Sequence, residues 1–358
     1  MFEVEEFRAD HKDVIHDCAY DFYGKRLATC SSDQFIKVWD QDENGKWTES
    51  ATWKAHSGSI WRISWAHPEF GQVLATCSFD RTAVVWEETT GEKTASSTFL
   101  PSKKWIRRTS LNDSRTSVTD VKFSPKLLGL LLATSSIDGI VRIYEAPDIM
   151  NLTNFSIQHE ISCKTSLKCL SWNNSLYKVH LPLLASGSDE VGSPTGKLFL
   201  HEYCDSARKW LKVDTPMIVT DSINDVAFAP NIGRSYRILA VASHDLYILN
   251  INQAKEPTQN NRWDITLAAK FSDHNCPVWR VCWNVTGTML ASSGDDGCVR
   301  IWKMNYMKQW KCAGVVKANG VLSPSFDQHP IVTSPASTPL NSIAKYYIKA
   351  NNSLKNKV

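Results

Sequence analysis

Apolar and polar residues alternate with a period of two along most of the chain, in short runs that end at turns. One example begins at Leu27, passes a turn at Asp33 and ends at Trp39. Alternation over four to eight residues, bounded by Asp-Gly or Ser-Asp turns, is typical of strands joined by hairpins. No stretch shows a convincing helical period. The pattern therefore predicts an all-β protein.

This arrangement recurs along the chain. In four copies an aromatic residue follows the turn aspartate by six positions, and two weaker copies end at His201 and Leu249. We place the six repeats at residues 9–47, 54–88, 112–146, 163–204, 222–251 and 272–304. Repeats of this kind correspond to four-stranded blades in WD-repeat proteins. The sequence predicts a six-bladed WD-repeat β-propeller over residues 1–317.

Three repeats also share a set of polar residues: His11, Thr29, Asp33 and Trp39; His56, Thr76, Asp80 and Trp86; and His274, Ser292, Asp296 and Trp302. One set alone could resemble a hydrolase triad, but a catalytic triad occurs once, whereas this set recurs with the blade. We interpret the sets as structural networks, because the WD family that the repeats resemble uses such sets to hydrogen-bond one turn to the next blade's strand, with tryptophan as an N–H donor. The third to fifth repeats lack the histidine, so we expect weaker bonding between blades there.

Composition restricts the function classes further. The chain has 358 residues with 40 Lys+Arg against 37 Asp+Glu, and residues 318–358 account for the whole excess of +3. A balanced body gives no electrostatic footprint for nucleic acid. The ten cysteines form no Cys-x-x-Cys pair, so we expect reduced, buried thiols and neither a metal nor another cofactor. Without a signal sequence or a long apolar segment, the sequence predicts a soluble intracellular protein with no membrane insertion.

Two further segments attract attention. Residues 103–108 form a basic run with an interleaved tryptophan, which could contact RNA or an acidic partner; we favour an outer edge strand whose charges discourage edge pairing. Residues 318–340 contain four prolines and no sustained apolar period. We expect residues 318–358 to be a disordered tail that the fold does not need.

The two ends of the chain decide how the propeller closes. Normally an N-terminal strand joins three C-terminal strands in one shared blade. Here residues 309–316 alternate well enough to be the sixth blade's own fourth strand, while Val4, Glu5, Glu6, Phe7 and Arg8 offer another strand. If both form, the ring is open and needs strands from another chain. The alternative is that residues 309–316 are tail and the ring closes on itself.

Several motifs carry a specific resemblance. Residues 10–17 (DHKDVIHD), 23–33 (YGKRLATCSSD) and 65–71 (WAHPEFG) resemble the Sec-thirteen group of open propellers. Residues 53–62 (WKAHSGSIWR), 77–88 (CSFDRTAVVWEE) and 138–148 (DGIVRIYEAPD) are similar to its nucleoporin branch, the Seh family. The match runs from about residue 10 to residue 316. It diverges from residue 319 onward and in the loops at 88–102 and 178–195.

The resemblance implies a non-enzymatic scaffold subunit of the Y-shaped outer-ring complex of the nuclear pore, which supports pore assembly and the transport of mRNA and protein. It implies that an α-solenoid nucleoporin completes the open ring with a blade of its own, at residues 4–8 and the adjoining faces of the first and last blades. Family members also serve in the GATOR complex, which signals amino-acid supply to the TOR kinase. The implied locations are the nuclear envelope, the cytoplasm and lysosomal surface, and kinetochores.

Two other readings compete with this one. A closed propeller acting as a peptide-recognition adaptor would need a ring of exposed aromatic or basic residues on one face, and the repeats show no patterned set of that kind. The related vesicle-coat propeller shares the first two repeats, but residues 105–160 and 279–312 favour the nucleoporin branch. An enzyme is disfavoured because no polar constellation stands outside the repeats.

Overall fold

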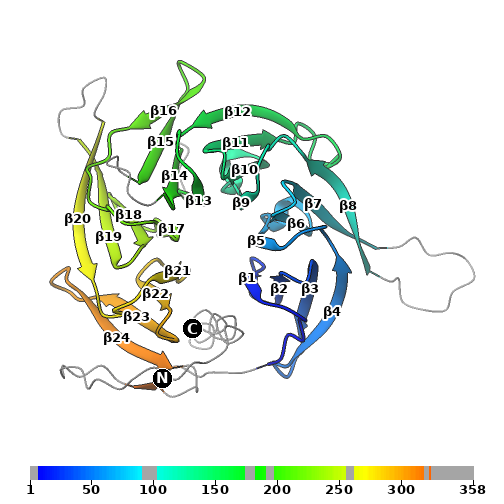
Figure 1. Ribbon diagram of the computed structural model, residues 1–358, viewed down its shortest axis with the longest axis horizontal. Helices are drawn as coiled ribbons and strands as arrows, with labels where there is room; N and C mark the ends of the chain where they lie inside the picture. The colour runs from blue at the N-terminus through cyan, green and yellow to red at the C-terminus, as the bar shows by residue number, and fades with distance from the viewer. Residues whose placement is uncertain are drawn as a thin grey trace, which may run out of the picture. The chain divides into compact units, whose positions relative to one another are not determined.

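The computed structural model describes residues 7–90, 103–173, 182–190, 197–254, 262–317 and 322–323. Within them the chain forms strands and turns, with two three-residue 3₁₀ segments, η1 (Pro68–Phe70) and η2 (Lys126–Leu128), as the only helical elements. The strands make six antiparallel sheets, each from one continuous stretch of chain (Figure 1). The fold is the predicted all-β, six-bladed WD-repeat β-propeller. No helix among the described residues has the length and apolar character that a membrane span requires.

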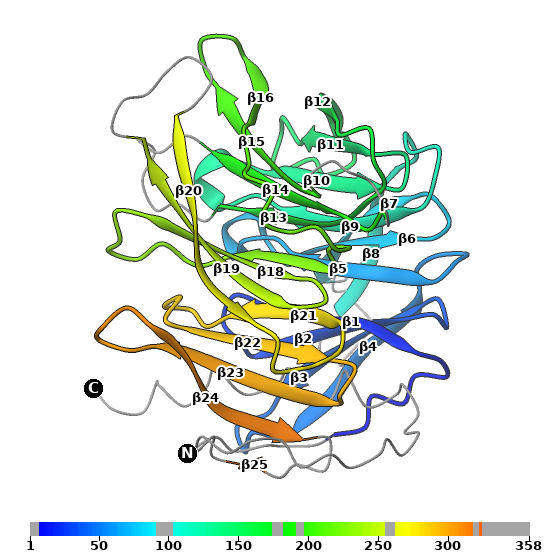
Figure 2. The ribbon, with the colours of Figure 1, turned by 60° about the vertical axis from the view of Figure 1, so that its left-hand side comes forward.

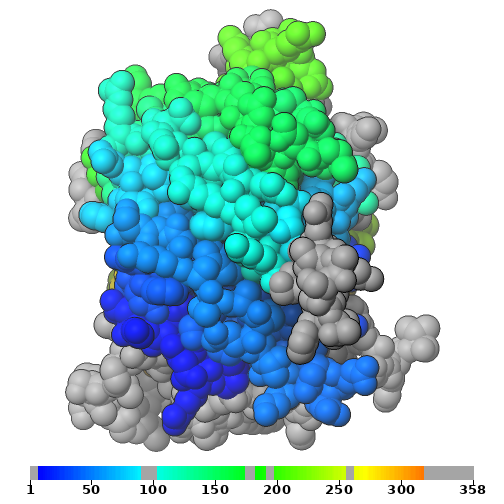
Figure 3. Space-filling model, turned by 90° about the vertical axis from the view of Figure 1, so that its right-hand side faces the viewer, coloured from blue at the N-terminus to red at the C-terminus, as the bar shows by residue number. Residues whose placement is uncertain are grey.

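Residues 8–164 form one compact unit that contains the first three sheets. Its outer strands β4 and β8 lie at the surface (Figure 3, blue to cyan). The strands are β1 (Ile15–Tyr20), β2 (Arg26–Ser31), β3 (Phe35–Gln41) and β4 (Trp47–Lys54); β5 (Ile60–Trp65), β6 (Val73–Ser78), β7 (Ala83–Thr90) and β8 (Lys103–Leu111); and β9 (Val118–Phe123), β10 (Leu131–Ser136), β11 (Ile140–Glu145) and β12 (Ser156–Ser162).

The second compact unit comprises residues 165–358 with residues 1–7, and it contains the other three sheets. The strands are β13 (Leu167–Trp172), β14 (Leu183–Ser188), β15 (Leu198–Cys204) and β16 (Lys209–Val213); β17 (Asp225–Phe228), β18 (Arg237–Ala242), β19 (Leu246–Gln253) and β20 (Trp263–Phe271); and β21 (Val278–Trp283), β22 (Met289–Gly294), β23 (Cys298–Met304), β24 (Trp310–Lys317) and β25 (Leu322–Ser323).

One strand pairing recurs in all six sheets. The leucine of each Leu-Ala-x run, in the second strand, lies opposite the residue that ends the repeat, in the third strand. These pairs are Leu27 with Trp39, Leu74 with Trp86, Leu132 with Tyr144, Leu184 with His201, Leu239 with Leu249, and Leu290 with Trp302. The two weak copies of the repeat therefore share the register of the strong ones.

The apolar core lies between consecutive sheets. Each unit holds two clusters, between the first and second and the second and third of its sheets. Strand β6 is buried at all six of its residues because it supplies both clusters of its unit: Leu74 packs toward the first sheet, and Val73 and Ala75 pack toward the third. This division follows from the period of two, since successive side chains of a strand point to opposite faces.

The sixth sheet has a fourth strand of its own. Strand β24 pairs with β23 from Met304 opposite Trp310 to Cys298 opposite Lys317. The prediction that this segment completes the sixth blade is thus confirmed, and the alternative that it belongs to the tail is wrong. The short β25 pairs with β24 through Val316 opposite Leu322 and Val315 opposite Ser323, which adds a fifth strand (Figure 2).

The predicted N-terminal strand is only partly described. Val4, Glu5 and Glu6 lie outside the described residues, and so does the predicted tail apart from β25. Phe7 and Arg8 are described and belong to no strand. The first sheet is nevertheless complete, because β1 to β4 follow one another between residues 15 and 54. No described sheet combines N-terminal with C-terminal strands.

Candidate functional site

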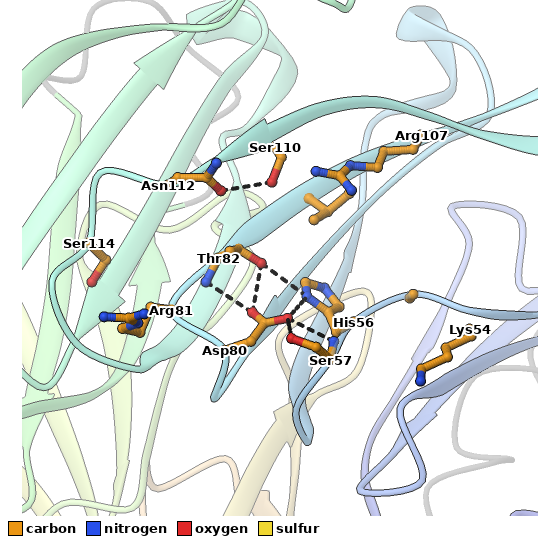
Figure 4. A pocket seen from close by; sticks show the side chains of 12 residues that line it. Lys54, His56, Ser57, Asp80, Arg81, Thr82, Arg107, Ser110, Asn112 and Ser114 are labelled. Carbon is orange, nitrogen blue, oxygen red and sulfur yellow. Dashed lines mark hydrogen bonds and ion pairs between the residues drawn. The ribbon is translucent and has the colours of Figure 1, made fainter.

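The second sheet brings one predicted polar set together. His56 lies between β4 and β5, Asp80 lies in the turn between β6 and β7, and Thr76 and Trp86 lie on those two strands. His56 Nδ1 is 3.0 Å from Asp80 Oδ2, and His56 Nε2 is 2.8 Å from Thr76 Oγ1 (Figure 4 shows the histidine and the aspartate). The indole N–H of Trp86 donates to the same Thr76 oxygen at 3.1 Å.

One assignment of the protons gives each of these four side chains a hydrogen-bond partner. A neutral His56 donates its Nδ1–H to Asp80 and accepts the Thr76 hydroxyl proton at Nε2, while Thr76 accepts from Trp86. Burial opposes the ionisation of Asp80. Hydrogen bonds from His56, from Thr82 and from the Ser57 backbone N–H outweigh that cost, and they hold the pKa of the carboxyl well below its usual range. The set therefore fixes a charged turn onto a buried strand.

The other two sets repeat this geometry. His11 lies 2.9 Å from both Asp33 and Thr29, and Trp39 donates to Thr29 at 3.2 Å. In the sixth sheet the distances from His274 to Asp296 and to Ser292 are 3.0 and 2.8 Å, and Trp302 donates to Ser292 at 2.8 Å. In each set the histidine precedes the inner strand and bonds to the turn and the second strand of the sheet that follows. The segments that carry His56 and His274 also connect that sheet to the preceding one, so these bonds hold a connecting segment against its own sheet.

The third and fourth sheets place other polar groups at these positions. In the third sheet Arg142 pairs with Asp138 at 3.1 Å, and the Tyr144 hydroxyl donates to Asp113 at 3.1 Å. In the fourth sheet His201 replaces the tryptophan and is only 3% exposed. Its Nδ1 has no hydrogen-bond partner among the described residues. Burial, together with the positive charge of Lys212, lowers the pKa of His201 to about 4.

Bonds between consecutive sheets come from residues that sequence reasoning missed. Asp17 Oδ2 accepts the Ile63 N–H at 3.0 Å, and Asp225 Oδ2 accepts the Val281 N–H at 3.1 Å. Serine hydroxyls on two other inner strands make the same kind of bond: Ser64 accepts the Phe123 N–H at 3.1 Å and Ser171 accepts the Phe228 N–H at 2.9 Å. Loss of the histidine in the fourth and fifth repeats therefore leaves inter-sheet bonds in place there.

The inner strands also share a β-bulge. In five of the six inner strands the pairing register shifts at the second residue. A bulge bends the strand and re-aims the side chain of the extra residue. The bulged residues are His16, Trp61, Thr119, Lys168 and Trp279. Of these five side chains only Trp279 is exposed and the other four are partly buried, so the bulge is a shared feature of the inner strands and differs from the ring of exposed residues that a peptide-recognition adaptor would need.

These bulged side chains make contacts within each unit. The rings of His16 and Trp61 are 4.5 Å apart between centroids. In the other unit the Lys168 ammonium lies 4.7 Å from the Trp279 ring centroid and donates to Asn224 at 2.7 Å. These contacts engage the rings of His16 and Trp61 and the ammonium group of Lys168. Trp279 nevertheless remains 37% exposed.

One group of side chains has the composition of a metal site. His274, Cys276 and Asp296 place one potential ligand atom each within 4.8 Å of one another. However, the Arg300 guanidinium contacts Asp296 and lies 3.0 Å from His274 Nδ1. Burial and the charge of Asp296 also raise the pKa of the Cys276 thiol, which disfavours the thiolate that a metal needs. A fixed cation already satisfies these groups, so we assign them to the polar network of the sixth sheet.

Comparisons with known proteins agree with the repeat and its register. The family model described as WD domain, G-beta repeat matches residues 4–40, 47–87 and 265–303. A chain from a crystal structure of the mitotic checkpoint complex, 14% identical, shares the fold with a TM-score of 0.58 over 83% of this chain and 76% of its own.

Sequence relatives are much closer. Nucleoporin seh1 of Drosophila melanogaster is 61% identical over 349 residues, which cover 98% of this chain and 97% of the relative. Nucleoporin SEH1 of Homo sapiens is 57% identical over 326 residues, which cover 89% and 90%. The predicted resemblance is confirmed at this level of identity and coverage. The chain belongs to the SEH1 nucleoporin family of WD-repeat proteins.

Proposed function

We propose that this protein is a non-enzymatic scaffold subunit of the outer-ring, Y-shaped complex of the nuclear pore. The observation that carries the proposal is family membership over nearly the full chain: relatives named as nucleoporins are 54–61% identical. The polar sets support a structural role, because each recurs with its sheet and uses its histidine, aspartate and tryptophan to hold that sheet together.

The terminal sheets suggest how such a scaffold binds. The first sheet has four strands and the sixth has five, each set from its own end of the chain, so neither requires a strand from the other end. A propeller whose ends share no blade leaves backbone donors and apolar surface to be covered. We infer that an α-solenoid nucleoporin supplies the missing strands, with residues 4–8 beside them, in an obligate interface of about 2,000 Å² or more.

Affinity purification from cell extract followed by mass spectrometry tests this function. The expected result is recovery of outer-ring nucleoporins that include an α-solenoid subunit. Recovery of ubiquitin-ligase components without nucleoporins would overturn the proposal in favour of a peptide-recognition adaptor. Recovery of vesicle-coat subunits alone would overturn it in favour of the coat relative.

The N-terminal contact has a matched test. Phe7 is partly buried, and proline there removes a backbone donor and a large apolar side chain. We expect Phe7→Pro to weaken co-purification of the solenoid partner by about tenfold, which corresponds to 1.4 kcal/mol. The control is Phe326→Pro in the C-terminal segment. Equal retention of the partner by both variants would exclude residues 4–8 from the interface.

A second assembly is part of the proposal. We infer from the family resemblance that a separate pool joins the GATOR complex at the lysosomal surface, and that the protein also visits kinetochores. Size-exclusion fractionation followed by detection of GATOR subunits tests the first point. If the chain co-elutes with nucleoporins alone in nutrient-replete and starved cells, the GATOR pool does not exist.

A further inference from the structure

The second sheet borders a polar groove of about 690 Å³. Its lining comes from the end of β4 and the loop to β5, the turn between β6 and β7 with the start of β7, strand β8 and the loop that follows β8 (Figure 4). Three cationic side chains, Lys54, Arg81 and Arg107, lie along it together with the polar residues Ser110, Asn112 and Ser114. All of these residues belong to the unit formed by residues 8–164.

The three cations carry no ion pair with any residue that the structure describes. Other basic side chains nearby are paired: Arg108, next along β8, lies 2.6 Å from Glu87, and Lys37 lies 2.9 Å from Glu49. The groove therefore differs from the surrounding surface in holding uncompensated positive charge.

The carboxylate in the groove is already engaged. Asp80 accepts hydrogen bonds from Thr82 and from the Ser57 backbone, and it pairs with His56. Its bonds run to the loop between β4 and β5 and to its own turn, as Figure 4 shows. The groove contains three cationic side chains and one carboxylate that already has hydrogen-bond partners. It therefore has an excess of positive charge, which attracts anionic groups.

This charge belongs to the second sheet rather than to the repeat. Arg81 occupies a turn position with φ of 71°, where the third and sixth sheets have Gly139 and Gly297 and the first has Gln34. A non-glycine residue in the left-handed region is uncommon and its conformation is costly. Arg107 lies opposite Trp86, and the corresponding position opposite Trp39 in the first sheet is Glu49. Arg81 thus occurs where the first, third and sixth sheets have neutral residues, and Arg107 occurs where the first sheet has an acidic one; in the fourth sheet this second position is also basic, with Lys212 opposite His201.

We propose that this groove binds an acidic peptide segment of a partner protein through its aspartate and glutamate side chains. The spacing of the cations favours an extended ligand with several carboxylates. Lys54 and Arg81 lie at opposite ends of the view in Figure 4, with Arg107 above them. A single phosphate would instead need cations that converge on one point. Guanidinium groups suit carboxylates because their paired N–H donors match the two carboxylate oxygens.

A free N–H donor on Asn112 fits the same ligand. Ser110 and Ser114 donate their hydroxyl protons to Asn112 and to the Thr116 carbonyl. The Asn112 oxygen is therefore used as an acceptor, which leaves its NH₂ group to donate to a peptide carbonyl or carboxylate. The basic run at residues 103–108 thus has a divided role: Arg108 is paired within the sheet, whereas Arg107 faces the groove.

Fluorescence anisotropy on the full chain tests the proposal. The probe is a labelled peptide in which Glu and Ser alternate over nine residues, and the matched peptide has Gln in place of every Glu. We expect the Glu probe to bind, the Gln peptide not to bind, and added salt to weaken binding because exposed charges are screened. Equal binding of both peptides, or no binding of either, would overturn the proposal.

Variants locate the binding site. Lys54→Gln combined with Arg107→Gln should weaken binding of the Glu probe by about fivefold or more, in line with the loss of two exposed ion pairs. Arg81→Asn, which tolerates the left-handed turn, should also weaken it. The control is Lys103→Gln, an exposed cation on the same strand as Arg107 and outside the groove. Equal weakening by Lys103→Gln would show general surface charge instead of a site.

A third peptide tests whether the groove binds phosphate groups instead of carboxylates. It carries one phosphoserine in the Gln background. Binding of this peptide in place of the Glu probe would make the groove a phosphopeptide site and overturn the assignment to carboxylates. Because the substituted side chains are exposed, thermal unfolding of all variants should match that of the parent. A variant that unfolds earlier is replaced by Arg107→Lys, which keeps the charge, loses the paired donors and should weaken binding less than Arg107→Gln.

Discussion

The second and fourth sheets have the same register and opposite electrostatics. Leu74 lies opposite Trp86, and Leu184 lies opposite His201. The second sheet keeps a carboxylate charged through the bonds of His56, whereas the fourth keeps His201 neutral by burying it. Both sheets form, so the alternating apolar strands determine the blade. The polar groups determine how each blade responds to mutation and to pH.

The largest expected effect concerns the second sheet. His56→Ala removes one hydrogen-bond partner of Asp80 and one of Thr76 at a site where His56 is 5% exposed. We expect a loss of about 1–3 kcal/mol in the free energy of unfolding, because two buried hydrogen bonds are lost. Urea denaturation at neutral pH measures it. Lys103→Ala, an exposed position, should cost less than about 0.5 kcal/mol. Similar values for the two variants would contradict the role assigned to this set.

The fourth sheet should respond to acid instead. A histidine whose pKa falls on folding stabilises the folded state fully above its unfolded pKa of 6.5, and this stabilisation is lost as the pH falls toward 4. From pH 7 to pH 5 the loss due to His201 is about 2 kcal/mol. His201→Leu should remove that part of the pH dependence, as measured by urea denaturation at both values. An unchanged pH dependence would mean that His201 is not buried as a neutral group.

The carboxylates of the three sets act in a different pH range. The pKa values of Asp33, Asp80 and Asp296 are lowered because hydrogen bonds outweigh the cost of burial. Their stabilisation is complete above the ordinary aspartate value of 3.8 and is lost only below it. They contribute little between pH 7 and pH 5. The comparison of the parent with His201→Leu in that window therefore isolates the fourth sheet.

A smaller effect is expected between sheets. Ser64→Ala removes the hydroxyl that accepts the Phe123 N–H and so joins the second and third sheets. We expect a cost of about 1 kcal/mol, the usual contribution of one hydrogen bond, and faster hydrogen exchange at the Phe123 amide. Ser162→Ala, at an exposed serine of β12, is the control. If exchange at Phe123 is unchanged, this bond does not hold the two sheets together.

The strands of each blade can be predicted from the sequence because they depend on local alternation of apolar and polar residues. The repeat fixed the leucine-aromatic register and the three polar sets, since spacing along a hairpin determines which residues face each other. The bulges at His16 and Trp279 were missed because an extra residue in a strand interrupts the alternation that identifies it. The bonds from Asp17 and Ser64 depend on the neighbouring sheet, more than forty residues away in sequence.

The sequence predicts only one part of the groove of the second sheet. The basic run at residues 103–108 is evident in the sequence. The alternation does not predict that Arg108 pairs with Glu87 or that Arg107 lines a groove. Lys54 and Arg81 come from other elements, which tertiary packing brings to the same place. A site assembled from three loops and strands has no single motif, so it becomes recognisable only when side-chain partners are known.

The smallest effect is expected at the C-terminus. Truncation after Ala318 removes β25, which makes two residue pairs with the edge of β24 and leaves the pairing of β24 with β23 intact. We therefore expect the melting temperature to change by no more than about 2 °C, since a change of 1 kcal/mol shifts a protein of this size by a few degrees at most. Truncation after Asn305, which deletes β24 as well, is the matched comparison and should prevent stable folding of the sixth sheet. A large drop from the shorter truncation would mean that residues beyond 318 stabilise the sixth sheet by more than the two residue pairs of β25.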